Sequence, residues 1–512
     1  MTSGSRTAPI RVTKMSSNGI WPRMLLAAYI VFSLPMTQAG GANKCCSKLS
    51  AALPGLVSLP GSDSYNSSVS SYWAQQQTLI SPSCIFAPAT ASDVSTALSK
   101  VLVPNSCVFA VRGGGHASLT AASNTNGGVT IDLRGINEIT FNADKTTVSI
   151  GGGQTIGNVY TKLAEYGLTV PAARDFSVGI GGSTIGGGFG YFSTSLGFAA
   201  NSVIENEVVL ANGAITLANQ ENNNDLWRAL KGGGNNFGII TKFTFKTSPL
   251  EDIWAGDIVR NATRDNIEGS ATALYNFVTN PNYDPKAYAF VTFGFAADEQ
   301  LVLTEYTYAA PVPNAPAFAE LLNVSGEPVL DSTAIKTVPE LSKESDMQSP
   351  YGLQQITFSL SVENNAQVIV DSWEILKNST YKIQNFESAS WGLTIEPVIP
   401  LAATAGSGED NTVINLGASP NGLILIICSA NFARAADYPV VNKAVKQLLT
   451  DLINHAKSLG VYNPYIDMNH AMEGQKVLAS YGSENLDFLK ATAIKYDPTK
   501  VFQKLMPGGF KL

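Results

Sequence analysis

The spacing of hydrophobic and polar residues changes along the chain, and the change falls near residue 250. Between about residues 80 and 247, short apolar runs are bounded by glycines and other turn residues, a pattern typical of short strands. Two segments of this region, 90–102 and 156–167, instead have apolar residues at helical spacing, and Gly167 is placed to end the second helix. Strands that alternate with helices indicate an α/β or α+β domain. The predicted strands are residues 107–114, 128–135, 146–153, 205–213 and 238–246.

From about residue 250 to 435 the apolar runs are longer and rich in β-branched and aromatic residues, with partial alternation. This pattern predicts one mostly antiparallel sheet. An amphipathic helix follows and ends at Gly460, and His455 falls beside its apolar stripe, at the boundary or surface. The stripe consists of Val441, Val445, Leu448, Leu449, Leu452 and Ala456. The predicted strands are residues 287–297, 301–310, 353–363, 391–399 and 422–430.

The first residues are typical of a secretion signal. Four basic residues precede a mostly apolar run at 24–34, and small residues near Ala39 suit cleavage. The run is too short to span a bilayer, and no other stretch is apolar for long enough. Residues 1–39 are therefore predicted to be a signal peptide, with an uncut membrane anchor as the alternative. The mature protein is predicted to be secreted, without stable membrane association.

Cysteine usage agrees with an oxidising compartment. Four of the five cysteines lie in the N-terminal quarter, whereas Cys428 stands alone in an apolar strand. One or two disulfides are expected among the first four. The neighbours Cys45 and Cys46 are poorly placed to bond to each other, so pairing with Cys84 and Cys107 is favoured, in an order that the sequence leaves open. Sequons that fit a secreted glycoprotein stand at Asn66, Asn261, Asn323 and Asn378.

Composition excludes several classes of function. Apolar residues make up 45% of the chain and charged residues 14%, which indicates a globular protein. The net charge is −7 and no dense Lys/Arg cluster occurs, so nucleic acid is not an expected partner. The three histidines have no metal-ligand spacing and Cys428 is far from any useful partner, so no metal site is predicted.

Glycine-rich loops recur at residues 112–116, 151–157, 179–190 and 231–238. Backbone N–H groups in such loops form concave sites for anions, well suited to a pyrophosphate. Several such loops in one domain suggest a dinucleotide. The chain nevertheless contains no G-x-G-x-x-G fingerprint, no P-loop and no G-x-S-x-G motif, so the usual NAD, ATP and serine-hydrolase interpretations fail.

The order of several motifs resembles that of the FAD-linked oxidases. They are VRGGGH at 111–116, VSIGGGQTIGNVY at 148–160, VGIGGSTIGGGFG at 178–190, KGGGNNFGIITKF at 231–243 and YDPTKVFQ at 496–503. The chain is most similar to the secreted berberine-bridge-enzyme-like branch of the vanillyl-alcohol-oxidase superfamily, and its N-terminal part to fungal members that act on secondary metabolites. The resemblance covers almost all of residues 45–512.

This resemblance implies an α+β fold with a two-part FAD-binding domain of the PCMH type. The C-terminal segment closes that domain, and an antiparallel-sheet substrate domain flanked by helices is inserted into it. After the signal peptide, the expected parts are an N-terminal segment of the FAD domain at 40–79, the FAD-binding domain at 80–250, the substrate domain at 251–459 and a C-terminal segment at 460–512 that completes the FAD site.

The resemblance gives His116 a specific role. It matches the histidine that carries the flavin through its 8α-methyl group in the family, a link that needs a neutral imidazole nitrogen. The alternative places His116 at the exposed tip of a tight loop. Some relatives add a cysteine tether at the position of Asp175, and the absence of a thiol here predicts a single covalent bond and weighs against a carbohydrate oxidase.

Further FAD contacts are implied along the same motifs. The loop from Ser177 to Gly190 is expected beside the pyrophosphate and flavin, and Ile240 near the adenine. The expected cofactor-binding residues besides His116 are Arg112, Gly113, Gly114, Gly115, Ala117, Ser118, Asp175, Ser177, Gly181, Gly182, Ser183, Gly186, Gly187, Gly188, Ile240 and Asn469.

Residues 460–471, GVYNPYIDMNHA, correspond to a segment that lines the flavin in relatives. Asn469 matches the family pattern, but Asp467 takes the place of the usual tyrosine and His470 stands where Tyr or Asp is more usual. Either side chain is a candidate base for a substrate hydroxyl or acidic C–H, and Glu396, on a strand expected to face the flavin, is a third. The alternative for Asp467 and His470 is that they only hydrogen-bond the strand or the cofactor, and the alternative for Glu396 is that it turns outward.

The predicted function is a secreted FAD-dependent oxidase, monomeric, acting on a small apolar secondary metabolite. Hydride would pass to flavin N5, a side chain would take a proton, and O2 would be reduced to H2O2. One alternative is an oligosaccharide oxidase with an open groove and stacking aromatics. Another is a flavin-retaining scaffold that shapes a cyclisation without redox turnover. Strand aromatics that would line an apolar pocket, or else pack in the core, are Tyr288, Phe290, Phe293, Tyr306, Tyr308 and Trp391.

Overall fold

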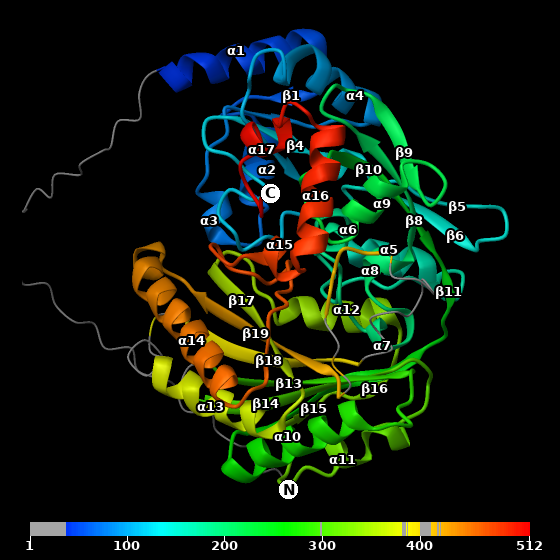
Figure 1. The fold of residues 1–512 in the computed structure, drawn as a ribbon, viewed down its shortest axis with the longest axis vertical. Coiled ribbons are helices and arrows are strands. Elements are labelled where there is room, and N and C mark those ends of the chain that lie inside the picture. The colour runs from blue at the N-terminus through cyan, green and yellow to red at the C-terminus, as the bar shows by residue number, and fades with distance from the viewer. Residues whose placement is uncertain are drawn as a thin grey trace, which may run out of the picture.

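The computed structural model describes residues 37–296, 299–380, 386, 388–399, 411–416, 419 and 421–512. Two halves lie one above the other, and the chain passes from the upper half to the lower and back again (Figure 1). Most of the expected signal peptide, residues 1–36, lies outside the described residues, and α1 (Thr37–Ala52) spans the expected cleavage site after Ala39. No helix among the described residues is both long and apolar enough to cross a bilayer.

The upper half contains a four-stranded sheet close to the N-terminus. Its strands are β1 (Val57–Ser58), β2 (Cys84–Phe86), β3 (Phe109–Arg112) and β4 (Val129–Asp132). Their order is β1-β2-β4-β3, with β2, β4 and β3 parallel and β1 antiparallel to β2. The predicted helix between β2 and β3 is α4 (Ala91–Thr96), which continues as the π-helix η1 (Ala97–Leu102). Thr90 and Asp93 exchange hydrogen bonds at its start, so a capping box fixes this boundary.

A five-stranded antiparallel sheet completes the core of the upper half, in the order β5-β6-β10-β8-β9. The predicted helix at 156–167 is confirmed as α5 (Ile156–Ala164), and Gly167 follows it with a φ of +64°. The sheet consists of β5 (Ile139–Phe141), β6 (Thr147–Gly151), β8 (Val203–Val209), β9 (Ile215–Asn219) and β10 (Ile239–Lys246). A separate pair joins β7 (Leu168–Thr169) to β11 (Ser248–Pro249). Shorter helices are α2 (Asp63–Ser70), α3 (Gln75–Thr78), α6 (Ile180–Ile185), α7 (Ser193–Leu196), α8 (Ala199–Ser202) and α9 (Asn224–Leu230).

Two disulfides tie α1 to the four-stranded sheet. Cys45 pairs with Cys107 just before β3, and Cys46 pairs with Cys84 at the start of β2. The expected disulfides among these four residues are confirmed. Cys428 is free and buried, and burial raises the pKa of its thiol, which leaves it unreactive. The sequon residues are exposed, and their glycosylation stays a prediction: Asn66, Asn261, Asn323 and Asn378.

Removing the second disulfide is expected to destabilise the upper half. In Cys46→Ala/Cys84→Ala the unfolded chain regains the freedom of the closed loop, which costs about 3 kcal/mol of stability. The denaturant midpoint of near-UV circular dichroism should therefore fall, and reduction should lower it less in the variant than in the parent. An unchanged midpoint in the variant would contradict this expectation.

The lower half is a nine-stranded sheet in which every described pairing is antiparallel, as predicted. The order along the sheet is β15-β12-β14-β13-β18-β19-β17-β20, and β16 also pairs with β12. The sequence patterns missed the strand β12 at its start. The strands are β12 (Ile253–Asn261), β13 (Ala287–Ala296), β14 (Glu299–Tyr308), β15 (Leu330–Asp331), β16 (Ala334–Lys336), β17 (Gln354–Glu363), β18 (Ser390–Val398), β19 (Leu423–Phe432) and β20 (Tyr462–Asn463).

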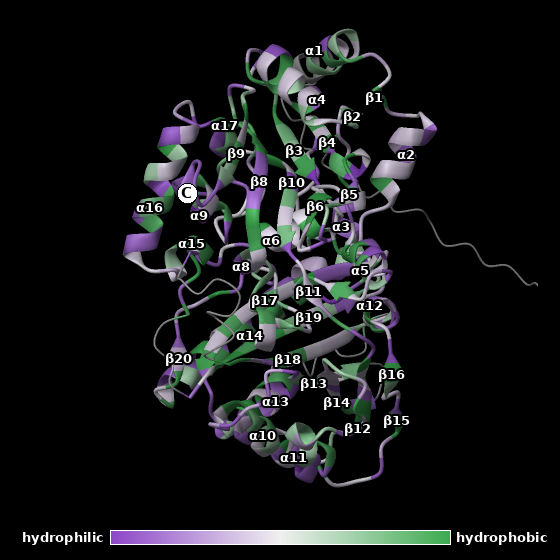
Figure 2. Ribbon diagram, turned by 90° about the vertical axis from the view of Figure 1, so that its right-hand side faces the viewer, coloured by the Kyte–Doolittle hydropathy of each residue, from purple (hydrophilic) through white to green (hydrophobic). Residues whose placement is uncertain are grey.

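Strict alternation divides this sheet into two faces. On β19, Ile424, Ile426 and Cys428 pack in the cluster beneath the outer helices, whereas Leu425 and Ile427 pack towards the upper half. The predicted helix that ends at Gly460 is α14 (Tyr438–Ser458), one of these outer helices. In Figure 2 hydrophobic colour is prominent on elements inside each half, as expected for two buried cores. Helices of the lower half are α10 (Arg264–Thr279), α11 (Ala319–Leu322), α12 (Val338–Met347), α13 (Ala366–Thr380) and α14 (Tyr438–Ser458), with 3-10 turns elsewhere.

After α14 the chain returns to the upper half (Figure 1). There the backbone N–H of Phe109 donates to the carbonyl of Leu505 at 2.7 Å, and Phe502 meets the Phe109 ring edge-on. The first and last parts of the chain thus share one core. The proposed domain boundaries stay predictions, although β12 begins just after 250 and α14 ends just before 460. The returning helices are α15 (Val477–Ser480), α16 (Ser483–Tyr496) and α17 (Val501–Lys504).

Candidate active site

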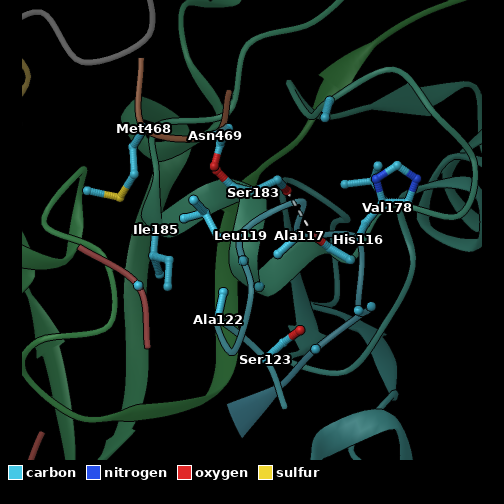
Figure 3. A pocket seen from close by; sticks show the side chains of 18 of the residues that line it. His116, Ala117, Leu119, Ala122, Ser123, Val178, Ser183, Ile185, Met468 and Asn469 are labelled. Carbon is cyan, nitrogen blue, oxygen red and sulfur yellow. Dashed lines mark hydrogen bonds between the residues drawn. The ribbon is translucent and has the colours of Figure 1, made fainter. Parts of the chain in front are cut away.

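A cavity of about 420 Å³ has walls from both halves. The upper half contributes the loop after β3, the loop before α6 and the segment 234–240, and the large sheet contributes β17, β18 and β19. Figure 3 shows His116 and Val178 on one side of this cavity and Met468 on the other. Asn469 links two parts of the cavity wall, because its side-chain nitrogen donates a hydrogen bond to the carbonyl of Ser183 at 2.9 Å.

Three of the glycine loops are closely packed against one another beside the cavity. A Cβ on Gly114 would stand 2.4 Å from the backbone nitrogen of Gly179, and one on Gly181 would stand 2.7 Å from the carbonyl oxygen of Gly152. Side chains at these positions would force the loops apart. Gly182 differs, since its missing Cβ would meet nothing within 4 Å and the residue lines the cavity. The glycines therefore bring the loops together and leave backbone open to a ligand at Gly182.

His116 lies in the cavity wall with an imidazole nitrogen that lacks a partner. Its ring stacks on Trp73, with centroids 4.2 Å apart and planes at 9°, and Tyr351 meets it edge-on. Nε2 is buried and has no hydrogen-bond partner in the described part of the chain. Burial lowers the pKa of His116, and the charges of Asp175 and Asp346 offset this only in part. Stacking holds the ring in place, and burial favours its neutral form.

His470 and Asp467 form a hydrogen-bonded pair in the segment after β20. Asp467 is 2% exposed, and its Oδ2 lies 2.8 Å from Nδ1 of His470. A carboxylate only accepts, so Nδ1 carries a proton, and in the neutral form of the ring Nε2 is the acceptor. Burial would lower the pKa of His470, but the hydrogen bond and charge of Asp467 outweigh it and raise that pKa. His470 lines the cavity, and Asp467 lies behind it.

Glu396 is buried beneath a charged residue of the cavity wall. Its carboxylate accepts hydrogen bonds from the guanidinium of Arg174 and the hydroxyl of Tyr288. Burial works against the charge of Arg174, but Glu396 and other acidic groups hold the pKa of Arg174 well above its usual range. Arg174 also stacks over the ring of Phe290, at 4.6 Å. Glu396 is thus positioned to hold Arg174, and Arg174 is the group that a ligand meets.

The cavity brings together many of the residues predicted from the sequence. The predicted cofactor residues that lie outside its wall are fixed by other contacts. Arg112 donates to the backbone carbonyls of Ser68 and Ser71 and stacks on Tyr72, and Ser177 donates to Asp346. The predicted residues in the wall are Gly113, Gly114, Gly115, His116, Ala117, Ser118, Asp175, Gly181, Gly182, Ser183, Ile240, Asn469 and His470. Those outside it are Arg112, Ser177, Gly186, Gly187, Gly188, Glu396 and Asp467.

The strand aromatics do not line the cavity. Phe293, Tyr306 and Trp391 pack in the cluster beneath the helices, and Tyr308 contacts that cluster. Tyr288 and Phe290 pack between the two halves. Core packing, the alternative considered for these residues, therefore accounts for them.

The sheet presents to the cavity polar side chains that the sequence patterns did not predict. Thr357, Thr394 and Ser429 line it from three neighbouring strands. Trp73 and Arg174 were also missed. Alternation along β18 and β19 could have assigned the strand residues to one face, but the sequence does not say which face is covered by helices. No sequence signal places Trp73 on His116.

Comparisons with known proteins fit this arrangement. The family model described as an FAD binding domain matches residues 82–218. The FAD-dependent monooxygenase sdcF of Emericella nidulans is 32% identical over 476 residues, which cover 91% of this chain and 98% of that protein. The similarity therefore extends over both halves.

Solved structures share the same fold. A variant of berberine bridge enzyme superposes with a TM-score of 0.70 at 21% identity and covers 90% of this chain and 98% of its own. The glucooligosaccharide oxidase of Acremonium strictum, whose structure concerns a 6-S-cysteinyl, 8α-N1-histidyl FAD, superposes with a TM-score of 0.72 at 19% identity, covering 90% of this chain and 97% of its own. At such low sequence identities, the two superpositions show a shared fold.

Proposed function

Because the chain belongs to the berberine-bridge-enzyme-like family of FAD-linked oxidoreductases, we propose that it is an oxidase with FAD bonded to His116. The observation that carries this proposal is the buried Nε2 of His116, which has no hydrogen-bond partner among the described residues and belongs to the wall of a glycine-lined cavity. A neutral imidazole is the form that acts as a nucleophile, and burial, which lowers the pKa of His116, favours that form.

The residues present fit FAD. Closely packed loops at 113–115, 151–153 and 179–182 leave backbone accessible in the way that a pyrophosphate requires. Segment 234–240 and residues near Phe510 offer a further part of the wall for the rest of the dinucleotide. Since Asp175 provides no thiol, the proposed link to the protein is the single bond at His116.

His470 is the proposed base of the reaction. Asp467 fixes its Nδ1–H, so Nε2 can take a proton from a substrate hydroxyl or acidic C–H in the cavity. When bound, FAD would supply the two-electron acceptor for the hydride of the substrate carbon, and O2 would be reduced to H2O2. Arg174, held by Glu396, supplies a fixed positive charge for the oxygen from which the proton leaves.

The proposed substrate is a secondary metabolite of fungal type with a largely apolar body and a hydroxyl at its reacting end. Phe189, Ile427 and Met468 offer apolar contact in the cavity, and Thr394 and Ser429 offer hydroxyls. Those same hydroxyls support an oligosaccharide oxidase as the second candidate.

We also propose that the protein is secreted and monomeric.

An anaerobic absorbance titration tests the proposal. The purified protein should be yellow, keep its flavin through acid precipitation and bleach with one of two panels, apolar aromatic or polyketide metabolites and soluble oligosaccharides. Bleaching by the metabolite panel supports the proposed substrate, and bleaching by sugars supports the second candidate. A flavin that stays oxidised with ligands shown to bind would instead support the scaffold without turnover. Loss of all flavin in acid would overturn the link to His116.

A further inference from the structure

Two carboxylates from different parts of the chain converge on His116. A ring nitrogen of His116, a carboxylate oxygen of Asp175 and one of Asp346 all lie within 4.8 Å of one another. Asp175 comes from the loop before α6 in the upper half and lines the cavity, whereas Asp346 comes from α12 in the lower half. This meeting of an imidazole and two acids is not used in the proposed oxidation.

Each carboxylate is held by a serine of the opposite half. The hydroxyl of Ser345 on α12 donates to Oδ1 of Asp175 at 2.7 Å. In the other direction, the backbone N–H of Ser177 donates to Oδ1 of Asp346 at 3.0 Å, and its hydroxyl donates to the same oxygen. These reciprocal contacts fix both acids relative to His116.

Further contacts hold the segment around Asp175 on α12. The hydroxyl of Ser342 donates to the carbonyl of Arg174 at 2.6 Å, and the N–H of Phe176 donates to the carbonyl of Ser342. Near the end of α12, the indole of Trp73, the ring that stacks on His116, donates to the carbonyl of Ser349. The lower half therefore helps to build the surroundings of His116.

The groups around His116 act on the protonation of its ring in opposite directions. Asp175 and Asp346 raise the pKa of the imidazole and His470 lowers it, while Tyr351 contacts the ring edge. When the unprotonated nitrogen of a neutral imidazole becomes bonded to carbon, the other ring nitrogen has to pass its proton to an acceptor for the ring to stay neutral, and water does not readily carry a proton from a buried site. A carboxylate within reach is such an acceptor.

We propose that Asp175 accepts the imidazole proton when His116 becomes bonded to the flavin, and that Asp346 is a positioning residue for this step. The inference rests on the proposed covalent link at His116. One N–C bond forms, the imidazole N–H and one C–H of the flavin 8-methyl group break, and the two electrons of that C–H leave on dioxygen. Dioxygen with the two protons becomes H2O2, so Asp175 is free again once it has released its proton.

The test follows covalent attachment directly. Full-length apoprotein from a riboflavin-limited host is mixed with FAD in air, and the flavin that stays with acid-precipitated protein is measured over time, together with the intact mass. We expect Asp175→Asn to slow attachment about 100-fold at neutral pH, because general-base contributions are of this order. Non-covalent FAD, measured in the native protein, should still bind. Asp144→Asn, at an exposed carboxylate that accepts hydrogen bonds from Thr146 in its own turn, is the matched control and should attach flavin at the parent rate.

Two further experiments distinguish a role of Asp175 in proton transfer from a purely structural role. Asp175→Glu should restore attachment at neutral pH, and Asp175→Asn should recover part of its rate as the pH is raised from 6 to 9, since hydroxide then replaces the carboxylate. Ser345→Ala leaves Asp175 in place and removes only its hydroxyl partner, so it should slow attachment less than Asp175→Asn does.

The outcomes of the test are distinct. If the parent never attaches flavin covalently, the proposed function fails at His116 and this inference fails with it. If the parent attaches flavin and Asp175→Asn does so equally fast, the role of Asp175 is wrong and the proposed function stands. A slow variant that neither Glu nor high pH rescues would show a structural role instead. If a chelator slowed the parent, the three groups would be holding a cation, and the proposal would be overturned.

Discussion

Replacing His116 with alanine is expected to abolish covalent flavin completely. The Nε2 of this residue is the proposed bonding atom, and the loop that carries it is held by other glycine contacts. The native His116→Ala protein should still bind FAD, but acid precipitation should leave all the flavin in the supernatant and the protein mass should equal that of the bare chain. The measurement is the absorbance of pellet and supernatant, with fluorescence of the denatured band as a second record.

The chain offers a matched control, because it contains only three histidines. His455 lies on the outer helix α14, where its Nε2 contacts Asp371 on α13 at 2.7 Å, at the boundary where the sequence pattern placed it. His455→Ala should keep covalent flavin in full. Flavin that survived acid in His116→Ala would show that another residue carries the bond.

Replacing His470 with glutamine is expected to slow substrate oxidation about 100-fold to 10,000-fold, because a positioned base contributes a factor of this order. Covalent flavin content should not change, since His116 is untouched. The measurement is the anaerobic rate at which the flavin is bleached by a substrate that bleaches the flavin of the parent protein. A variant that bleached at the parent rate would point to a base elsewhere in the cavity wall.

The pH profile of the same reaction identifies the partner of His470. A base works when it is neutral, so the bleaching rate should rise with pH through the raised pKa of His470, above the ordinary histidine value of about 6.5. Asp467→Asn removes the charge that raises this pKa and leaves burial, which lowers it. The rising limb of the profile should therefore move to lower pH in Asp467→Asn. A rising limb at the same pH as in the parent would show that Asp467 does not set the pKa of the base.

Much of the fold was predictable because its signals are local. The strands β13, β14, β17, β18 and β19 have long β-branched and aromatic runs, and α14 has an uninterrupted apolar stripe. The strand β12 was missed because Gly256, with a φ of +143°, and two charged residues interrupt its pattern. The order of strands was not predictable, since pairing depends on contacts between distant segments.

The residues of the candidate site were likewise predictable where they lie in one contiguous motif and unpredictable where distant segments meet. His116 and the glycine loops were found because their motif is contiguous. His470 and Asp467 were found in one short segment, but only the structure shows that His470 faces the cavity while Asp467 lies behind it. The meeting of Asp175 with Asp346 left no trace in the sequence, because it depends on α12 packing across the two halves. The pairing of Cys45 with Cys107 and of Cys46 with Cys84 was open for the same reason.

The hydrogen bond between Phe109 and Leu505 has a consequence for the order of folding during synthesis. The upper half needs residues from both ends of the chain, whereas the large sheet is built almost entirely from the residues between them. Contacts between distant segments form late, because a long loop must close first. The cysteines near the N-terminus leave the ribosome early, but the wall near Phe510 can be completed only after the last residues emerge. We therefore expect the nascent chain to be cross-linked before it is able to hold its cofactor, and attachment of the flavin to mark the end of folding.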